Sequence, residues 1–118
     1  MDEQKPLINR QKFPRIKSVN LTSYETADDK DFESEGLGIT QNISLGGLML
    51  EVNKNFPVDT VIAVELALHD KTIKAKGRVM HVQEIDDNKY DLGMKFVEIT
   101  QQDFNTLWEY LEQKKKEK

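Results

Sequence analysis

The sequence predicts one mainly antiparallel β domain, a barrel or a sandwich, followed by a single C-terminal helix. Short segments of alternating apolar and polar residues recur between turn-forming residues, which is typical of antiparallel barrels and sandwiches rather than of alternating β–α folds. The last segment changes to a helical period. The length of 118 residues suits one domain with one core.

The first half of the chain contains the less regular elements. A first strand is expected from Arg15 onward, where apolar residues scatter among serines and threonines in an irregular phase: Ile16, Val19, Leu21 and Tyr24. The following elements are then a polar connection over 25–35, a strand over 37–43, a break at Gly46-Gly47, an apolar segment over 48–52 and a turn over 53–59 that contains Pro57.

The second half alternates more cleanly. The clearest strand places an apolar residue at every second position: Ile62, Val64, Leu66 and Leu68. After a turn at 69–71, one face of a long strand is expected to carry Ile73, Ala75, Gly77, Val79 and His81. Its other face is expected to carry Thr72, Lys74, Lys76 and Arg78. A turn at 86–88 leads to a last strand with alternating Tyr90, Leu92, Met94 and Phe96.

The C-terminal segment predicts an amphipathic helix. Its apolar stripe follows the i, i+3, i+4, i+7 spacing through Phe104, Leu107, Trp108 and Leu111. Thr100 followed by Asp103 resembles a capping box, and the three lysines 114–116 complement the helix dipole. We expect Trp108 to pack against an opening of the barrel.

Composition limits the possible functions. The net charge of −4 argues against a DNA- or RNA-binding surface, which is usually basic. No apolar run approaches the length of a transmembrane helix, and the polar N-terminus lacks a signal-peptide core, so we expect a cytoplasmic protein that does not insert into membranes. The chain contains no cysteine, which excludes disulfides and thiolate chemistry.

The residue pattern does not indicate an enzyme. The two histidines lie in different settings, and the acidic residues gather mainly in the 25–35 connection. No local spacing places a carboxylate pair or a Ser/His/Asp set. We therefore expect no catalytic residue, no metal site and no cofactor.

Charge is distributed unevenly near the N-terminus. Residues 4–24 contain no acid but five basic residues: Lys5, Arg10, Lys12, Arg15 and Lys17. The 25–35 connection is then strongly acidic. A basic arm on an acidic body indicates local anion binding, and the alternative is a solvated tail followed by a solvated loop.

The segment Asn42-Ile43-Ser44-Leu45-Gly46-Gly47 is the second candidate for chemistry. Asn42 and Ser44 alternate with Ile43, so their side chains should point away from the core. Asparagine offers a donor and an acceptor, and serine offers a hydroxyl. Gly46 and Gly47 can adopt a positive φ and let a ligand approach the backbone. The alternative is a tight turn whose polar side chains satisfy their own backbone.

These residues resemble a known family. Asn42-x-Ser44-x-x-Gly47 fits the (Asp/Asn)-x-Ser-x-x-Gly motif of PilZ domains, with Arg15 upstream and Gly93-Met94-Lys95-Phe96 downstream at the family's usual places. The resemblance spans residues 10–112 and implies a six-stranded antiparallel barrel with a closing helix. Residues 1–9 would then be a flexible lead-in and residues 113–118 a charged tail. PilZ domains bind the bacterial second messenger cyclic di-GMP.

The resemblance also implies roles for individual residues. Arg15 matches the second arginine of the family's Arg-x-x-x-Arg element, but Gln11 stands at the first position, flanked by Arg10 and Lys12. The ligand would be held by this arm and by the turn, through Arg10, Gln11, Lys12, Arg15, Asn42, Ser44, Gly46 and Gly47.

Two further residues are lesser candidates for ligand contact. His81 follows Val79 on the apolar face by parity, so its alternative is a satisfied histidine at a barrel end. Lys95 lies on the face opposite Met94 and Phe96, and its alternative is an ordinary surface lysine.

The sequence therefore predicts a non-catalytic cyclic di-GMP receptor whose basic arm closes over the ligand and which acts on an unidentified downstream protein. Gln11 favours an alternative, a degenerate PilZ domain that binds another protein instead of the nucleotide. The sequence leaves open whether the protein is a monomer or a homodimer.

Overall fold

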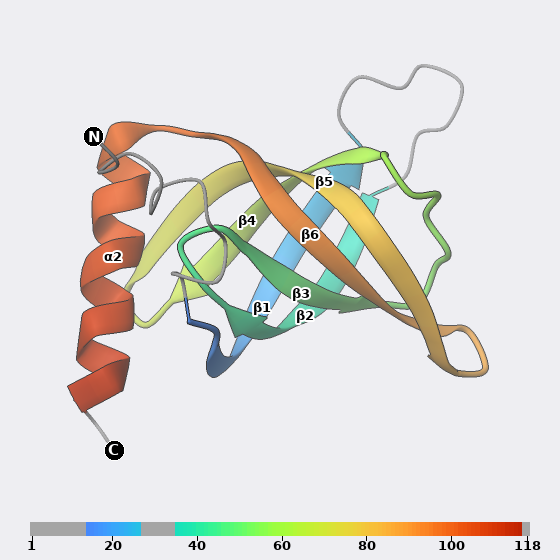
Figure 1. Ribbon diagram of the computed structural model, residues 1–118, viewed down its shortest axis with the longest axis horizontal. Helices are drawn as coiled ribbons and strands as arrows, with labels where there is room; N and C mark the ends of the chain where they lie inside the picture. Colours follow the sequence, from blue (N-terminus) through green and yellow to red (C-terminus); the bar gives the residue numbers. More distant parts are fainter. Residues whose placement is uncertain (1–13, 27–34, 117–118) are drawn as a thin grey trace, which may run out of the picture.

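The computed structural model describes residues 14–26 and 35–116 and shows a closed barrel of antiparallel strands with one helix beside it (Figure 1). The elements are β1 (Ile16–Thr26), β2 (Glu35–Ile43), β3 (Gly47–Val52), β4 (Val61–Leu68), β5 (Lys71–Asp86), β6 (Lys89–Ile99) and α2 (Gln101–Lys116). The six strands close in the order β1-β2-β3-β6-β5-β4. The predicted fold class is confirmed.

Some sequence predictions concern residues beyond this description. The N-terminal lead-in and the arm residues Arg10, Gln11 and Lys12 lie outside the described residues, as does most of the polar connection. Both strands that flank this connection are longer than predicted, since β1 continues to Thr26 and β2 already begins at Glu35.

The core follows the predicted alternation in the second half of the chain. Ile62, Val64, Leu66 and Leu68 of β4 are all buried, as predicted. Phe56, which was not predicted as a core residue, lies in the loop between β3 and β4 and is fully buried. Its ring meets Tyr24 edge to face, with 5.6 Å between the ring centroids. A lone aromatic residue in a turn segment gives no periodic signal.

Strand β1 alternates regularly, so the predicted irregular phase is wrong. Its polar residues face the interior: Ser18, Asn20 and Thr22. Val19 and Leu21 face outward and are 66% and 61% exposed. The interior polar side chains hydrogen-bond to one another, because Thr22 Oγ1 lies 2.7 Å from Thr40 Oγ1 and Ser18 donates to the Asn20 amide oxygen Oδ1 at 2.6 Å.

Helix α2 packs on the barrel through Leu107 and Leu111, which are buried. The Tyr110 hydroxyl lies 2.7 Å from Ser18 Oγ and accepts from Asn20 Nδ2 at 3.2 Å, which joins the helix to the polar interior of β1. Trp108 is 48% exposed, so its predicted packing against a barrel opening is wrong. The helix thus turns its Leu107–Tyr110–Leu111 side to the barrel, where the two leucines are buried and the tyrosine hydroxyl reaches buried polar partners.

The start of α2 is fixed to the sheet by its cap. Thr100 Oγ1 accepts from the Asp103 backbone N–H at 3.1 Å, as an N-cap threonine should. The Asp103 carboxylate accepts from the backbone N–H of Lys74 in β5, also at 3.1 Å. The helix continues through Lys116, so the lysines at 114–116 form its last turn.

Candidate functional site

A β-bulge turns Asn42 to the outside of the barrel. Thr40 pairs with Leu50 and Asn42 pairs with Met49, so the β2 strand has one more residue than β3 at this point, namely Gln41. Ile43, next to Asn42, is fully buried in the core. Burial of Ile43 and the bulge at Gln41 together present the Asn42 amide on the outer surface.

Arg15 lies at the same corner. Its Nη1 donates to Asn42 Oδ1 at 2.6 Å, although the two residues are 27 positions apart in the sequence. Arg15 is exposed and immediately precedes β1. The contact uses a single N–H of the guanidinium group, so further donors remain for an anion or a purine edge.

Ser44 points into its own turn rather than away from the core, which corrects the orientation predicted from alternation. Its side chain is buried, and its hydroxyl accepts from the Gly46 backbone N–H at 3.1 Å. The Ser44 N–H donates to the Gly47 carbonyl at 2.8 Å, and the Phe96 N–H donates to the Gly46 carbonyl at 2.9 Å. The segment is a tight turn that satisfies its own backbone and is held on β6.

Gly47 is required for a different reason from the one predicted. Among the described residues no glycine has a positive φ. A Cβ atom at Gly47 would instead overlap the carbonyl oxygen of Met94 in the neighbouring strand β6. The absence of a side chain therefore lets the turn lie directly against β6.

His81 lies on the outer surface, so its predicted place on the apolar face is wrong. The β5–β6 register shifts between Val79 and His81, which leaves Val79 buried and turns His81 outward. The imidazole then covers Gly93, where a Cβ atom would collide with the ring. The pairings place His81 in one cross-strand row with Gly93, Met49 and Asn42.

Lys95 and Arg78 extend this surface. Gly47 pairs with Lys95, and Lys95 pairs with Arg78, so all three lie in one cross-strand row, separated from the His81 row by the inward-facing pair of Leu48 and Met94. Both basic side chains are exposed. Arg78 was predicted on the polar face of the long strand but was not a candidate for ligand contact. Only strand pairing shows that it shares a face with Lys95.

The site is thus an outer face of the neighbouring strands β2, β3, β6 and β5 (Figure 1). Arg15 lies at the corner of this face, where it hydrogen-bonds to Asn42. The site presents an amide from Asn42, an imidazole from His81 and the cationic groups of Arg15, Lys95 and Arg78. Cationic forks suit phosphates and purine acceptor edges, and an amide suits a base edge. Chemically, this face fits an anionic ligand that also carries a base.

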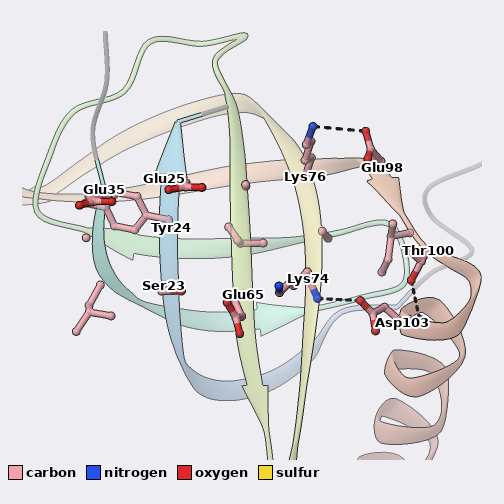
Figure 2. A pocket seen from close by; sticks show the side chains of 16 residues that line it. Ser23, Tyr24, Glu25, Glu35, Glu65, Lys74, Lys76, Glu98, Thr100 and Asp103 are labelled. Atoms are coloured by element: carbon pink, nitrogen blue, oxygen red, sulfur yellow. Dashed lines mark hydrogen bonds and ion pairs between the residues drawn. The ribbon is translucent and has the colours of Figure 1, made fainter. Parts of the chain in front are cut away.

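A wide groove of about 770 Å³ lies away from Arg15 and Asn42, along β1, the start of β2, β4, β5, the end of β6 and the start of α2 (Figure 2). Its lining includes Glu25, Glu35 and Leu37. Its charges are mixed. Lys76 pairs with Glu98 at 3.7 Å, and Asp103 caps the Lys74 backbone N–H. Because Asp103 ties the start of α2 to β5, and neither Arg15 nor Asn42 lines this groove, we do not include it in the site.

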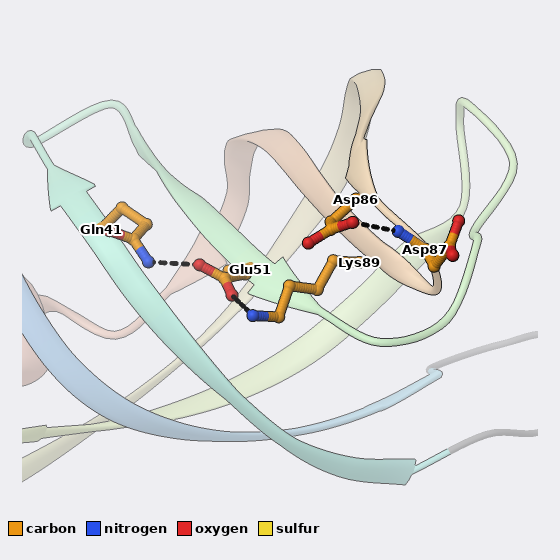
Figure 3. Close-up of polar contacts among 5 residues, drawn as sticks. All are labelled: Gln41, Glu51, Asp86, Asp87 and Lys89. Carbon is orange, nitrogen blue, oxygen red and sulfur yellow. Dashed lines mark hydrogen bonds and ion pairs between the residues drawn. The ribbon is translucent and has the colours of Figure 1, made fainter.

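Two carboxylates are paired across β3 and β6 on the outer surface. Glu51 lies opposite Asp91 in the strand pairing. The Glu51 carboxylate accepts from the Gln41 amide at 2.7 Å and meets the Lys89 ammonium at 3.8 Å (Figure 3). One carboxylate oxygen of Asp91, Oδ1, is buried without a hydrogen-bond partner among the described residues. Desolvation by burial, and then the charge of Glu51, raise the pKa of Asp91.

This pair predicts a pH-dependent stability effect. A carboxyl whose pKa is higher in the folded state destabilises the fold above that pKa, and the penalty disappears as the pH falls through the shifted value towards the ordinary value of 3.8. Asp91→Asn should therefore raise the free energy of unfolding at pH 7, and the difference from wild type should shrink on acidification. Urea titrations from pH 7 to pH 4 measure this. A constant difference across that range would contradict it.

The part of the chain that the structure describes offers no cluster of three or more His, Cys, Asp or Glu side chains placed to hold a metal ion. Within that same part, no helix has the length and apolar character needed to cross a membrane.

Comparison with known proteins agrees with the predicted family and fold. The family model of the PilZ domain matches residues 9–113. The chain belongs to the PilZ domain family. The matched span includes the arm, the Asn42–Gly47 turn and most of α2, and PilZ domains are receptor domains rather than enzymes. No curated protein sequence matches the chain.

Solved PilZ structures have the same fold at low sequence identity. The Bacillus subtilis inhibitor of motility MotI/DgrA superposes with a TM-score of 0.77 at 18% identity, covering 94% of this chain and 54% of its own. The PilZ domain of Escherichia coli YcgR with c-di-GMP has a TM-score of 0.70 at 16% sequence identity, and the match covers 92% of this chain and 94% of the YcgR domain. The K. pneumoniae MrkH–c-di-GMP complex has a TM-score of 0.66 at 18% sequence identity, and the match covers 88% of this chain and 51% of MrkH. The chain thus spans about half the length of MotI/DgrA and MrkH.

Proposed function

We propose that this PilZ domain is a non-catalytic receptor for cyclic di-GMP. In this proposal the ligand sits on the outer face beside Asn42 and the Ser44–Gly47 turn, and the basic arm that ends at Arg15 closes over it. The hydrogen bond between Arg15 and Asn42 carries the proposal, since it brings the end of the arm to the turn motif. The c-di-GMP complexes of YcgR and MrkH, which have the same fold, support the choice of ligand.

The side chains on this face account for recognition. The guanidinium of Arg15 can fork onto a phosphate or onto the O6 and N7 atoms of guanine, or stack on the purine. Lys95, Arg78 and His81 add positive or donating groups along the same face. Ser44 shapes the turn through its buried hydroxyl, while Gly46 and Gly47 give the backbone its close fit to β6.

Isothermal titration of the full chain with cyclic di-GMP tests this function. We expect heat from saturable binding at micromolar concentrations in low salt, with GMP as a control that lacks the second guanine. Because the arm orders on the ligand, binding should carry an unfavourable entropy. The absence of any heat at these concentrations would overturn the proposal.

Gln11 favours a second candidate function, a PilZ domain that has lost the nucleotide and binds a protein. Gln11 cannot provide the charge-assisted fork of an arginine at this position. Gln11→Arg distinguishes the two. If the domain is degenerate, this change should create or greatly strengthen cyclic di-GMP binding. If Arg10 already provides the charge-assisted contact to cyclic di-GMP, Gln11→Arg should change the affinity little, while Arg10→Ala should weaken binding.

As a receptor, the domain would act in the cytoplasm on a downstream protein, since ordering of the arm would change the surface available to a partner. No cofactor beyond the ligand is needed for this role.

A further inference from the structure

The outer surface of β1 and β2 carries an apolar patch that we call the β1–β2 face. It consists of Val19, Leu21, Leu37 and Ile39, which are 66%, 61%, 65% and 39% exposed. The strand pairing places Leu21 opposite Ile39 and Ser23 opposite Leu37, so the four side chains are neighbours on one face. The four apolar side chains are not among the residues proposed to bind the nucleotide, but the Arg15–Asn42 corner borders one end of the patch, because Lys17 pairs with Asn42.

The exposure of this patch is imposed by the register of β1. A slip of one residue would bury Val19 and Leu21 and expose Ser18 and Asn20. The fold does the opposite, because Ser18 and Asn20 are held inside by Tyr110, and Asn20 also donates to the Ala67 carbonyl at 2.9 Å. The apolar side chains therefore stay on the surface.

The size of the patch indicates a contact surface. Four large side chains exposed to this degree present roughly 400 Å² of apolar surface, a size at which patches on soluble proteins are often functional. The barrel is closed, so a partner cannot add a strand to an open edge. A second sheet can still cover the patch by packing flat on this face.

The charges at the two ends of the patch point to the occupant. Glu25 and Glu35 face each other across β1 and β2 at one end, and like charges in this position repel. Lys17 lies at the other end of the same β1 face. None of the three forms an ion pair with another described residue. Lys17 and Glu25 are equally distant from Leu21 along the strand, so a two-fold axis at Leu21 would bring Lys17 of one copy to the acidic pair of the other.

We propose that the β1–β2 face is the interface of a homodimer of this chain, in which two copies pack face to face with their β1 strands antiparallel. A two-fold contact of this kind uses the same patch on both copies. Two patches with their charged ends would bury about 1,000 Å² in total, which is near the lower limit of specific interfaces. We therefore expect a reversible dimer.

Analytical ultracentrifugation over a range of protein concentrations tests the interface. Wild type should show a monomer–dimer equilibrium, and Leu21→Arg or Leu37→Arg should raise the dissociation constant by at least about tenfold. Val97→Arg is the matched control, because Val97 is 45% exposed on β6, which lies opposite β1 in the barrel order. A wild type that stays monomeric, or a control that behaves like Leu21→Arg, would overturn the proposal.

Charge exchange tests the antiparallel orientation. Lys17→Glu and Glu25→Lys should each weaken the dimer, since each creates like charges across the interface. The double variant should recover most of the wild-type association. Failure of the double variant to recover, with native circular dichroism for all three proteins, would contradict the proposed arrangement. Because these measurements need no ligand, their outcome is independent of cyclic di-GMP binding.

Discussion

Gly47→Ala is expected to destabilise the domain by about 3 kcal/mol or more, the upper range for inserting a methyl group where none fits. The new Cβ would overlap the carbonyl oxygen of Met94, which belongs to the β6 backbone. A backbone atom in a paired strand cannot move aside without disrupting the ladder between β3 and β6. Urea unfolding followed by circular dichroism measures the loss of free energy. In thermal unfolding, the melting temperature of a domain of this size should fall by more than about 10 °C.

Gly93→Ala provides the matched control for this prediction. A Cβ atom at Gly93 would also collide with a neighbour, but that neighbour is the exposed imidazole of His81, which can rotate away. We therefore expect a much smaller loss of stability for Gly93→Ala than for Gly47→Ala. Equal losses would show that the contact with the β6 backbone is not the reason for a glycine at position 47.

Arg15→Ala should weaken cyclic di-GMP binding by about 10- to 150-fold. The variant removes charge-assisted hydrogen bonds, each of which is worth about 1.5–3 kcal/mol. It also frees the Asn42 amide from its bond to the guanidinium group. Isothermal titration against wild type measures the change. Because Arg15 is exposed, the midpoint of urea unfolding should stay unchanged.

Two further variants separate the guanidinium group from its charge. Arg15→Lys keeps the positive charge but loses the planar fork, so its affinity should lie between those of wild type and Arg15→Ala. Lys54→Ala removes an exposed positive charge from the loop after β3 and should leave affinity unchanged. An Arg15→Ala protein that binds as tightly as wild type would contradict the proposed role of the arm.

The order of the elements was predictable from the sequence because it depends on local periodicity. The alternation through β4 and the helical spacing of Leu107 and Leu111 each come from side chains that are neighbours in the chain. The Asn42–Gly47 motif and its place between strands were readable in the same way. The alternation of inward and outward side chains failed as a guide where a register shift interrupts the strand. The register shift after Val79 reversed the predicted orientation of His81.

The sequence by itself determined that this chain forms an antiparallel β domain with a C-terminal helix and a PilZ-type turn, since these features follow from the alternation of side chains and from short motifs. Tertiary structure alone decided which groups meet. Strand pairing brings Arg78 beside Lys95, and the closed barrel places Arg15 on Asn42. It also turns the polar side of β1 inward, because Ser18 and Asn20 find their partner in Tyr110, a residue about 90 positions away. Contacts between such distant residues depend on how the barrel closes, which no local pattern records.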